Sequence, residues 1–407
     1  TALLILIVVM VIGVPIPLSF LASAAYICFV NGTDHLMLFT YGFRVQNTIL
    51  LLTIPLFVMA GAVIDKGGIG EKLIEGLERF SKGSKVALGT VTIVACAIFG
   101  AVSGSASATT SCIGSIMTPR LKENGYTAGH IGALLASSGV LGIMIPPSIL
   151  MILYAWGTGT SVLACFLATI IPGIILIILF SLVNAWLVKH EGPESPEARA
   201  ALEQMLIDAQ KKEAEKKLVK AEHEKRKGGT SAIPAVLMPI FLLGGIYGGV
   251  FTTTEGAAFS VLYSLVIGIF YYRKIDFPTF RKTLSQSGET AGTIMVMLFM
   301  VSILSRLYMT ENLPDTILNT LTSISSNRIV LLLMINLFMI IIGMLMDDCS
   351  GTTLCGPILM PVMGALGITP VQFAAILSVN IGMGNVTPPT APLLYLGGRV
   401  AGAQVKD

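Results

Sequence analysis

Four long stretches of this sequence contain no Asp, Glu, Lys or Arg, and they restrict the possible folds more than any other feature: residues 1–33, 86–119, 127–188 and 349–398. Each is longer than the roughly 20 apolar residues that a membrane-spanning helix needs. Charged residues make up only 12% of the chain, about half the fraction of a typical soluble domain. Because lipid offers the backbone no water to bond, a single chain of this kind crosses the bilayer as helices. The sequence therefore predicts an all-α polytopic membrane protein.

The chain also repeats itself at an offset of 242 residues. The Pro-Pro pair at 146–147 aligns with the pair at 388–389, and Gly142 aligns with Gly384. Further Pro, Gly and Thr positions agree without a gap, namely Thr110, Gly114, Pro119, Gly125 and Thr127 with Thr352, Gly356, Pro361, Gly367 and Thr369. The hydroxyl-rich run FGAVSGSASATTSCIG at 99–114 thus has a counterpart in GMLMDDCSGTTLCG at 343–356. Two related structural units are expected.

Basic residues predict how the first repeat sits in the membrane. They flank residues 86–119 on both sides, at Lys66, Lys72, Arg79, Lys82 and Lys85 before and at Arg120 and Lys122 after. Such clusters favour the cytoplasm, so the segment begins and ends on one side. Each arm of about 16 residues would be about 24 Å long at 1.5 Å per residue, too short to span comfortably. We therefore predict a re-entrant hairpin with its tip at Ala101–Ser107.

The second repeat is predicted to enter from the opposite side, as a hairpin over 329–362 after an external surface helix near 312–325. Another surface helix is expected at 68–80, and two crossing helices are expected to break at Pro146-Pro147 and Pro388-Pro389. Inverted repeats with interrupted helices are typical of secondary transporters. The remaining predicted crossings are 2–30, 46–65, 161–188, 231–250, 256–272 and 289–309, and the repeat predicts a counterpart of 161–188 near 403–430.

Interrupted helices bring carbonyls, N–H groups and dipole ends to the middle of a membrane. Carbonyl and hydroxyl oxygens suit a hard cation such as Na⁺, and restarting helix N-termini suit a carboxylate. Asp347 and Asp348 are the only formal charges between Arg328 and Arg399, and intramembrane acids are usually functional. We therefore predict substrate binding by Ser103, Ser105, Asp347, Asp348 and Asn380. We predict at least two sodium sites from Ser103, Ser105, Ser107, Gly142, Ile145, Ser350, Gly351, Gly384 and Thr387.

Other interpretations of these residues stay open at this stage. The serine-rich tip is also compatible with small-residue helix packing, and one Asp could serve only as a helix cap. Ser103 with His130 weakly resembles the Ser–His pair of an intramembrane serine protease, although Ala101 stands where the expected Gly would be. A passive channel is a further class. The six cysteines form no CxxC pair and fit small buried side chains.

Several motifs together resemble the large membrane subunit of tripartite ATP-independent periplasmic (TRAP) transporters. They are FGAVSGSASAT with a following P-x-L-x-x-x-G-Y, then GIMIPPS, GGVFTTTEGAA and GNVTPPTAPLLY. The resemblance covers essentially the whole chain. TTTE departs from the Thr-Pro-Thr-Glu of many relatives, and the linker at 189–228, with ten basic and nine acidic residues, is longer than expected.

The resemblance implies a sodium-driven elevator importer of the bacterial inner membrane for sialic acids, other acidic sugars or C4-dicarboxylates. A periplasmic binding protein would deliver the anion and a small four-helix membrane subunit would brace the scaffold, with no nucleic-acid partner. A stand-alone sodium-coupled dicarboxylate carrier is the alternative. The implied domains are scaffold and cytoplasmic arm (1–85), first transport half (86–188), cytoplasmic linker (189–230), scaffold and periplasmic arm (231–327), and second transport half (328–407).

Overall fold

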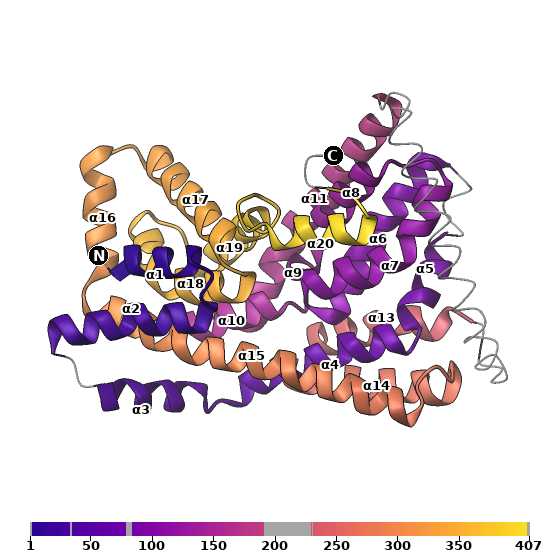
Figure 1. Ribbon diagram of the computed structural model, residues 1–407, viewed down its shortest axis with the longest axis horizontal. Coiled ribbons are helices and arrows are strands. Elements are labelled where there is room, and N and C mark those ends of the chain that lie inside the picture. The colour runs from indigo at the N-terminus through magenta and orange to yellow at the C-terminus, as the bar shows by residue number, and fades with distance from the viewer. Residues whose placement is uncertain (1, 33–34, 79–83, 191–228, 230, 405–407) are drawn as a thin grey trace.

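The computed structural model describes residues 2–32, 35–78, 84–190, 229 and 231–404, and its regular elements are all helical. Six of these helices are long and apolar enough to cross a membrane, or seven if one bent pair is counted as a single span. In Figure 1 one helical hairpin lies in the left half of the molecule and the other in the right half. The prediction of an all-α polytopic membrane protein is confirmed in this part of the chain.

The first hairpin consists of α6 (Lys85–Ser103) and α7 (Ala106–Glu123), which pack against each other. The chain reverses at Gly104, whose φ of +63° is a left-handed conformation that glycine adopts without strain. Ser105 then caps α7 by accepting a hydrogen bond from the backbone N–H of Ala108 at 3.4 Å. The hairpin and its tip therefore lie where the sequence predicted them.

The second hairpin repeats this geometry with α17 (Arg328–Leu345) and α18 (Asp348–Ala365). Helices α7 and α18 begin and end 242 residues apart, so the internal repeat is present in the structure. Asp347 occupies the position of Ser105 and caps α18 through the backbone N–H groups of Cys349 and Ser350. The same position thus carries a hydroxyl in one repeat and a carboxylate in the other.

A broken helix follows each hairpin, as predicted. In the first half, α8 (Ala128–Gly139) and α9 (Leu141–Met144) are followed by α10 (Ile149–Thr158), with a bend of 44°. In the second half, α19 (Pro370–Gly384) is followed by α20 (Pro392–Ala401). The Pro-Pro pairs lie in these breaks, and each contains a cis peptide bond.

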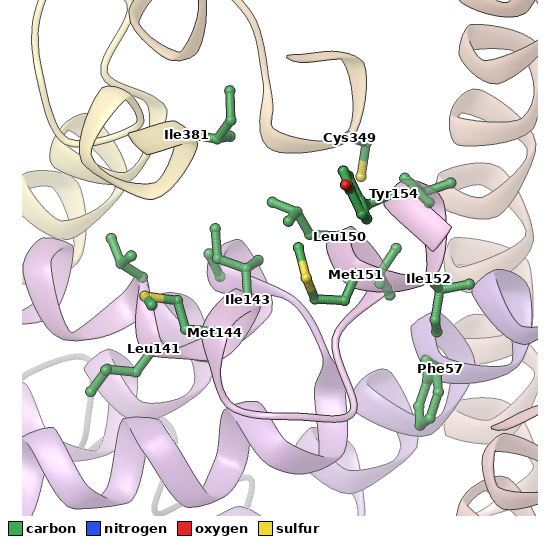
Figure 2. Packing of buried hydrophobic residues seen from close by; sticks show 14 of the residues in the cluster. Phe57, Leu141, Ile143, Met144, Leu150, Met151, Ile152, Tyr154, Cys349 and Ile381 are labelled. Carbon is green, nitrogen blue, oxygen red and sulfur yellow. The ribbon is translucent and has the colours of Figure 1, made fainter. Parts of the chain in front are cut away.

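The first break is surrounded by protein. Residues 149–155 are all buried, and Figure 2 shows α9 and α10 contributing side chains to one apolar cluster with Phe57, Cys349 and Ile381 from three other helices. Broken backbone is tolerated at membrane depth only where protein or a cavity surrounds it. The core of the molecule therefore provides the environment that the break requires.

The two halves interlock through the helices that restart after the breaks. Helix α20 packs against α7 and α8, where a Cβ at Gly397 would lie 2.7 Å from the carbonyl of Gly132. Reciprocally, α10 packs against α18, and the Tyr154 hydroxyl donates to the carbonyl of Pro370 at 2.7 Å. Each half is thus held partly by the other, which favours their behaving as one unit.

A second group of helices forms a layer beside this unit. Helix α4 (Thr53–Lys66) follows the 3₁₀ turn η1 (Ile49–Leu52) and packs against α14 (Thr253–Val266), which continues as the π-helical turn η2 (Ile267–Tyr271). The 34-residue helix α15 (Phe277–Thr310) packs against α4 and also against α18. The other elements are α3 (His35–Gln46), α5 (Ile69–Glu78), α11 (Val162–His190), α13 (Ile233–Tyr247) and α16 (Leu313–Ile324).

One predicted crossing is wrong. Residues 2–30 do not form a single helix but fold into α1 (Ala2–Val11) and α2 (Ile16–Asn31), and the Ser23 hydroxyl donates to the carbonyl of Ala2 at 2.9 Å. The cause is local, since Gly13 has a φ of +93° and Pro15 starts the next helix. The two helices therefore lie side by side, as Figure 1 shows.

The structure contains one helix that was not predicted and one that is longer than predicted. Helix α3 was not predicted, and α15 begins well before residue 289 because Asp276 caps it, accepting from the Thr279 N–H at 2.9 Å. The predicted linker at 189–230 lies almost wholly outside the described residues, as does the predicted helix near 403–430.

Candidate functional site

The two hairpin tips meet at a cavity of about 410 Å³. Helices α4, α10 and α15 complete its walls, so the repeated unit and the neighbouring layer both contribute. The lining residues are Phe57, Val58, Gly61, Ala62, Asp65, Phe99, Ser103, Gly104, Ser105, Ser107, Ala108, Ser111, Cys112, Ile149, Gln286, Ser287, Thr290, Ile294, Asp347, Asp348 and Cys349.

The tip of the first hairpin presents a compact group of oxygens. The buried Ser103 hydroxyl is 3.2 Å from the Thr109 hydroxyl, which donates to the carbonyl of Ser105 at 2.7 Å. Gly142 lies directly behind this group, because a Cβ there would be 2.7 Å from the same carbonyl. The tip is anchored to the restarting helix by a 3.2 Å hydrogen bond from the Ile149 N–H to the Gly104 carbonyl.

The tip of the second hairpin carries charge. One oxygen of Asp347 accepts from the N–H groups of Cys349 at 3.1 Å and Ser350 at 3.3 Å, and the other accepts from the Ser350 hydroxyl. Asp348 accepts from the Cys349 N–H at 3.1 Å. One ligand atom from each of Asp347, Asp348 and Cys349 lies within 4.8 Å of the others. The positive end of α18 favours negative charge here, and the paired acids also attract a cation.

The charge balance of the cavity is negative. Its lining includes three carboxylates and, within the described part of the chain, no Lys, Arg or His. Asp65 is paired with Lys66 at 2.7 Å, which leaves Asp347 and Asp348 without a basic partner in the lining. Hard oxygen donors of this kind are chemically suited to a small hard cation such as Na⁺.

The structure brings five predicted residues together at the cavity: Ser103, Ser105, Ser107, Asp347 and Asp348. It places Asn380 elsewhere, since its amide donates to Asn336 at 2.5 Å and to the carbonyl of Ile376 at 2.8 Å. That amide therefore joins α19 to α17.

The remaining predicted ligands lie behind the tips and outside the lining. Ile145 packs towards Gly173, and Gly384 lies against Gly343, with a Cβ at 384 only 2.5 Å from the Gly343 Cα. Thr387 uses its hydroxyl to donate to the carbonyl of Met383 at 2.7 Å. Gly142, Ser350 and Gly351 sit beside the caps described above. Their role as ligands stays a prediction.

Sequence reasoning missed the wall contributed by α15, which includes Gln286, Ser287 and Thr290. Gln286 and Ser287 lie before the predicted span at 289–309, and Thr290 lies at its start. For these three residues the available signal was their i, i+1, i+4 spacing, which places them on one helix face. Sequence reasoning also missed Thr109 and Asp65.

Ser103 has neighbours that differ from those of a hydrolytic serine. Its hydroxyl is within hydrogen-bond distance of the Thr109 hydroxyl and the Ser105 carbonyl. His130 instead makes an edge contact with the ring of Tyr126, with centroids 4.8 Å apart. The Ser103–His130 pairing considered from sequence is thus not the arrangement formed.

Comparison with known proteins gives a consistent result. Residues 3–407 match the family model described as the tripartite ATP-independent periplasmic transporter, DctM component. The chain is 29% identical, over 98% of its length, to the isethionate TRAP transporter permease protein DctMQ of Oleidesulfovibrio alaskensis. It is 30% identical to the C4-dicarboxylate large permease protein DctM of Pseudomonas aeruginosa over 88% of the chain. It is also 30% identical to the sialic acid large permease protein SiaM of Vibrio cholerae over 86% of the chain.

The matched share of these relatives differs. The chain spans 60% of the isethionate permease, 79% of the C4-dicarboxylate permease and 77% of the sialic acid permease. Among solved structures, the YdaH transporter of Alcanivorax borkumensis aligns with a TM-score of 0.54 at 14% identity, covering 93% of this chain and 82% of that one. This likeness concerns the fold alone.

Proposed function

Because the chain belongs to the DctM component family of tripartite ATP-independent periplasmic transporters, we propose that it imports a small organic acid across the bacterial inner membrane with sodium ions. The observation that carries the proposal is the cavity where the two hairpin tips meet. It combines serine hydroxyls from one repeat with two carboxylates from the other. Sodium ions would neutralise the acids, and the anion would bind beside the ions.

Sodium coupling supplies the energy that such transport needs. Each positive charge moved inward across 100 mV releases about 2.3 kcal/mol. Two sodium ions carried with one monoanion move a net positive charge, so the membrane potential and the sodium gradient act in the same direction. ATP is not required for accumulation of the anion.

The arrangement of the helices supports an elevator mechanism. The hairpins, α8–α10, α19 and α20 would move as one unit, since α10 and α20 interlock the two repeats. Helices α2, α4, α14 and α15 would form the static scaffold. The cavity lies at the boundary between the two groups, which is where a moving cargo site would meet a fixed wall.

The proposed partners follow from the family. A small four-helix membrane subunit would extend the scaffold, and a periplasmic binding protein would deliver the acid. Relatives named for isethionate, C4-dicarboxylates and sialic acid define a test panel of isethionate, succinate and N-acetylneuraminate, to which we add gluconate.

Uptake into proteoliposomes containing the chain, its small membrane subunit and its binding protein tests the proposal. We expect accumulation of one panel acid only with an inward sodium gradient and only when the binding protein is present. Ser103→Ala and Asp347→Asn should abolish uptake, whereas Asp315→Asn, which makes the same charge change at an exposed site on α16, should not. Uptake without the binding protein would favour a stand-alone carrier, and uptake without sodium would refute the coupling.

A further inference from the structure

The wall of the cavity formed by α15 differs from the other walls in its chemistry. Gln286, Ser287 and Thr290 face the cavity from successive turns, and Ile294 continues the same face. The first three of these side chains are polar but uncharged. The α4 wall is formed mainly by the apolar residues Phe57, Val58, Gly61 and Ala62. A cargo in the cavity therefore meets an amide and hydroxyls on one side and carbon on another.

Ser287 gives the clearest indication that the α15 wall binds something. The residue is 5% exposed, and its hydroxyl has no hydrogen-bond partner within the described residues. A buried polar atom left without a partner is unfavourable, and such atoms are rare in native structures. Because Ser287 lines the cavity, turning its hydroxyl towards the cavity would let a cargo hydroxyl or carbonyl supply the missing bond.

The neighbours of Ser287 extend this capacity. Gln286 is exposed, and its side-chain amide offers two donors and an acceptor. The Thr290 hydroxyl donates to the Gln286 carbonyl at 3.0 Å, so its oxygen can still accept. Together they can both donate to and accept from an uncharged polar group.

The same wall is poorly suited to a second negative charge. The described lining contains no basic residue, and Asp347 and Asp348 already require cations. A dicarboxylate would place its second carboxylate beside uncharged groups with no positive partner in the described lining, and a charge that loses water on binding without gaining such a partner is strongly unfavourable. A hydroxyl or amide in that position meets groups of matching chemistry.

We propose that the α15 face made of Gln286, Ser287 and Thr290 is a specificity wall that selects monoanionic organic acids carrying hydroxyl or amide groups over dicarboxylates. This inference rests on the proposed function and narrows its substrate class. The anionic group lies at the hairpin tips beside the sodium ions, and the uncharged polar groups lie against α15.

The test uses the reconstituted transporter and measures kcat/KM for N-acetylneuraminate, gluconate, isethionate and succinate under a sodium gradient. In the wild type, at least one of the three hydroxylated monoanions should exceed succinate. Gln286→Met keeps the length of the side chain and removes its hydrogen bonds, and Ser287→Ala removes only the buried hydroxyl. Each substitution should lower the ratio of kcat/KM for the preferred monoanion to kcat/KM for succinate about tenfold, which is the effect of losing one good hydrogen bond. The change should arise mainly from a higher KM for the monoanion.

Thr293→Ala is the matched control, because Thr293 lies on α15 outside the cavity lining and its hydroxyl donates to the Glu289 carbonyl of its own helix at 3.0 Å. In this variant the ratio of kcat/KM for the preferred monoanion to kcat/KM for succinate should equal that of the wild type. Sodium-dependent uptake with succinate as the best substrate, or variants indistinguishable from Thr293→Ala, would overturn the specificity wall and leave the proposed function standing. If no panel acid showed sodium-dependent uptake, both would be overturned.

Discussion

Replacing Gly100 with alanine should push the first hairpin away from the broken helix that follows it. Gly100 lies on α6, and a Cβ there would be 2.5 Å from the Cα of Gly142, 3.0 Å from its nitrogen and 3.2 Å from the carbonyl of Leu141. All three atoms belong to the backbone of α9, so no side-chain rotation can relieve the clash. The second repeat has a similar crossing between Gly343 and Gly384.

The size of the effect follows from these distances. Carbon atoms prefer separations of about 3.5 Å or more, so the two helices must move apart by about 1 Å. Overpacking of this kind typically lowers stability by about 1–3 kcal/mol, and rigid backbone on both sides favours the upper end. Alanine regains about 1 kcal/mol through its higher helix propensity. We therefore expect Gly100→Ala to lower the free energy of unfolding by about 2 kcal/mol.

Unfolding in mixed detergent micelles, followed by circular dichroism, measures this change. Gly292→Ala is the matched control, since Gly292 lies within a helix and a Cβ there would meet no atom within 4 Å; it should gain up to about 1 kcal/mol. The two variants should thus differ by about 3 kcal/mol. A Gly100→Ala protein as stable as Gly292→Ala would refute the packing argument.

Three further substitutions test other parts of the structure. Ser148→Ala removes the buried hydroxyl that donates to the Ile143 carbonyl at 2.5 Å and caps α10, and should lower unfolding free energy by about 1–2 kcal/mol in the same micelle assay. Tyr126→Phe removes the hydroxyl that lies within hydrogen-bond distance of the Lys85 carbonyl at 2.8 Å and the Asn184 amide oxygen at 3.1 Å, and should lower the unfolding free energy by about 1–3 kcal/mol, with a smaller loss in the Asn184→Ala background. Thr252→Ala removes a capping box at the start of α14, and should lower stability by about 1 kcal/mol while leaving the uptake rate per folded molecule unchanged.

The hairpins and the helix breaks could be predicted from the sequence because their signals are local. Gly104 and Ser105 reverse the chain, and the Pro-Pro pairs cannot continue a helix. The repeat pairs the run at 99–114 with the run at 343–356, so the second hairpin follows from the first, and Asp347 and Asp348 stand out as the only formal charges between Arg328 and Arg399. Residues 2–30 were mispredicted because hydrophobicity alone hides a turn such as the one at Gly13.

The complete cavity could not be predicted, because tertiary packing decides which faces meet. Gln286 and Ser287 lie close to the hairpin tips only because α15 packs against both α4 and α18. Asn380 has the polarity of a site residue, but the position of Asn336 on the neighbouring helix decides its hydrogen bond. Sequence thus located the tips, while the side chains across from them required the structure.

The most direct test of the central claim is a high-resolution cryo-electron microscopy map of the complex in lipid nanodiscs with sodium and the acid that it transports best. Density for the acid should lie between Ser103–Ser107 and Asp347–Asp348, with ions coordinated by oxygens of the two turns. Density for the acid at any other place, or the two turns separated by packed side chains with no room for cargo, would contradict the account.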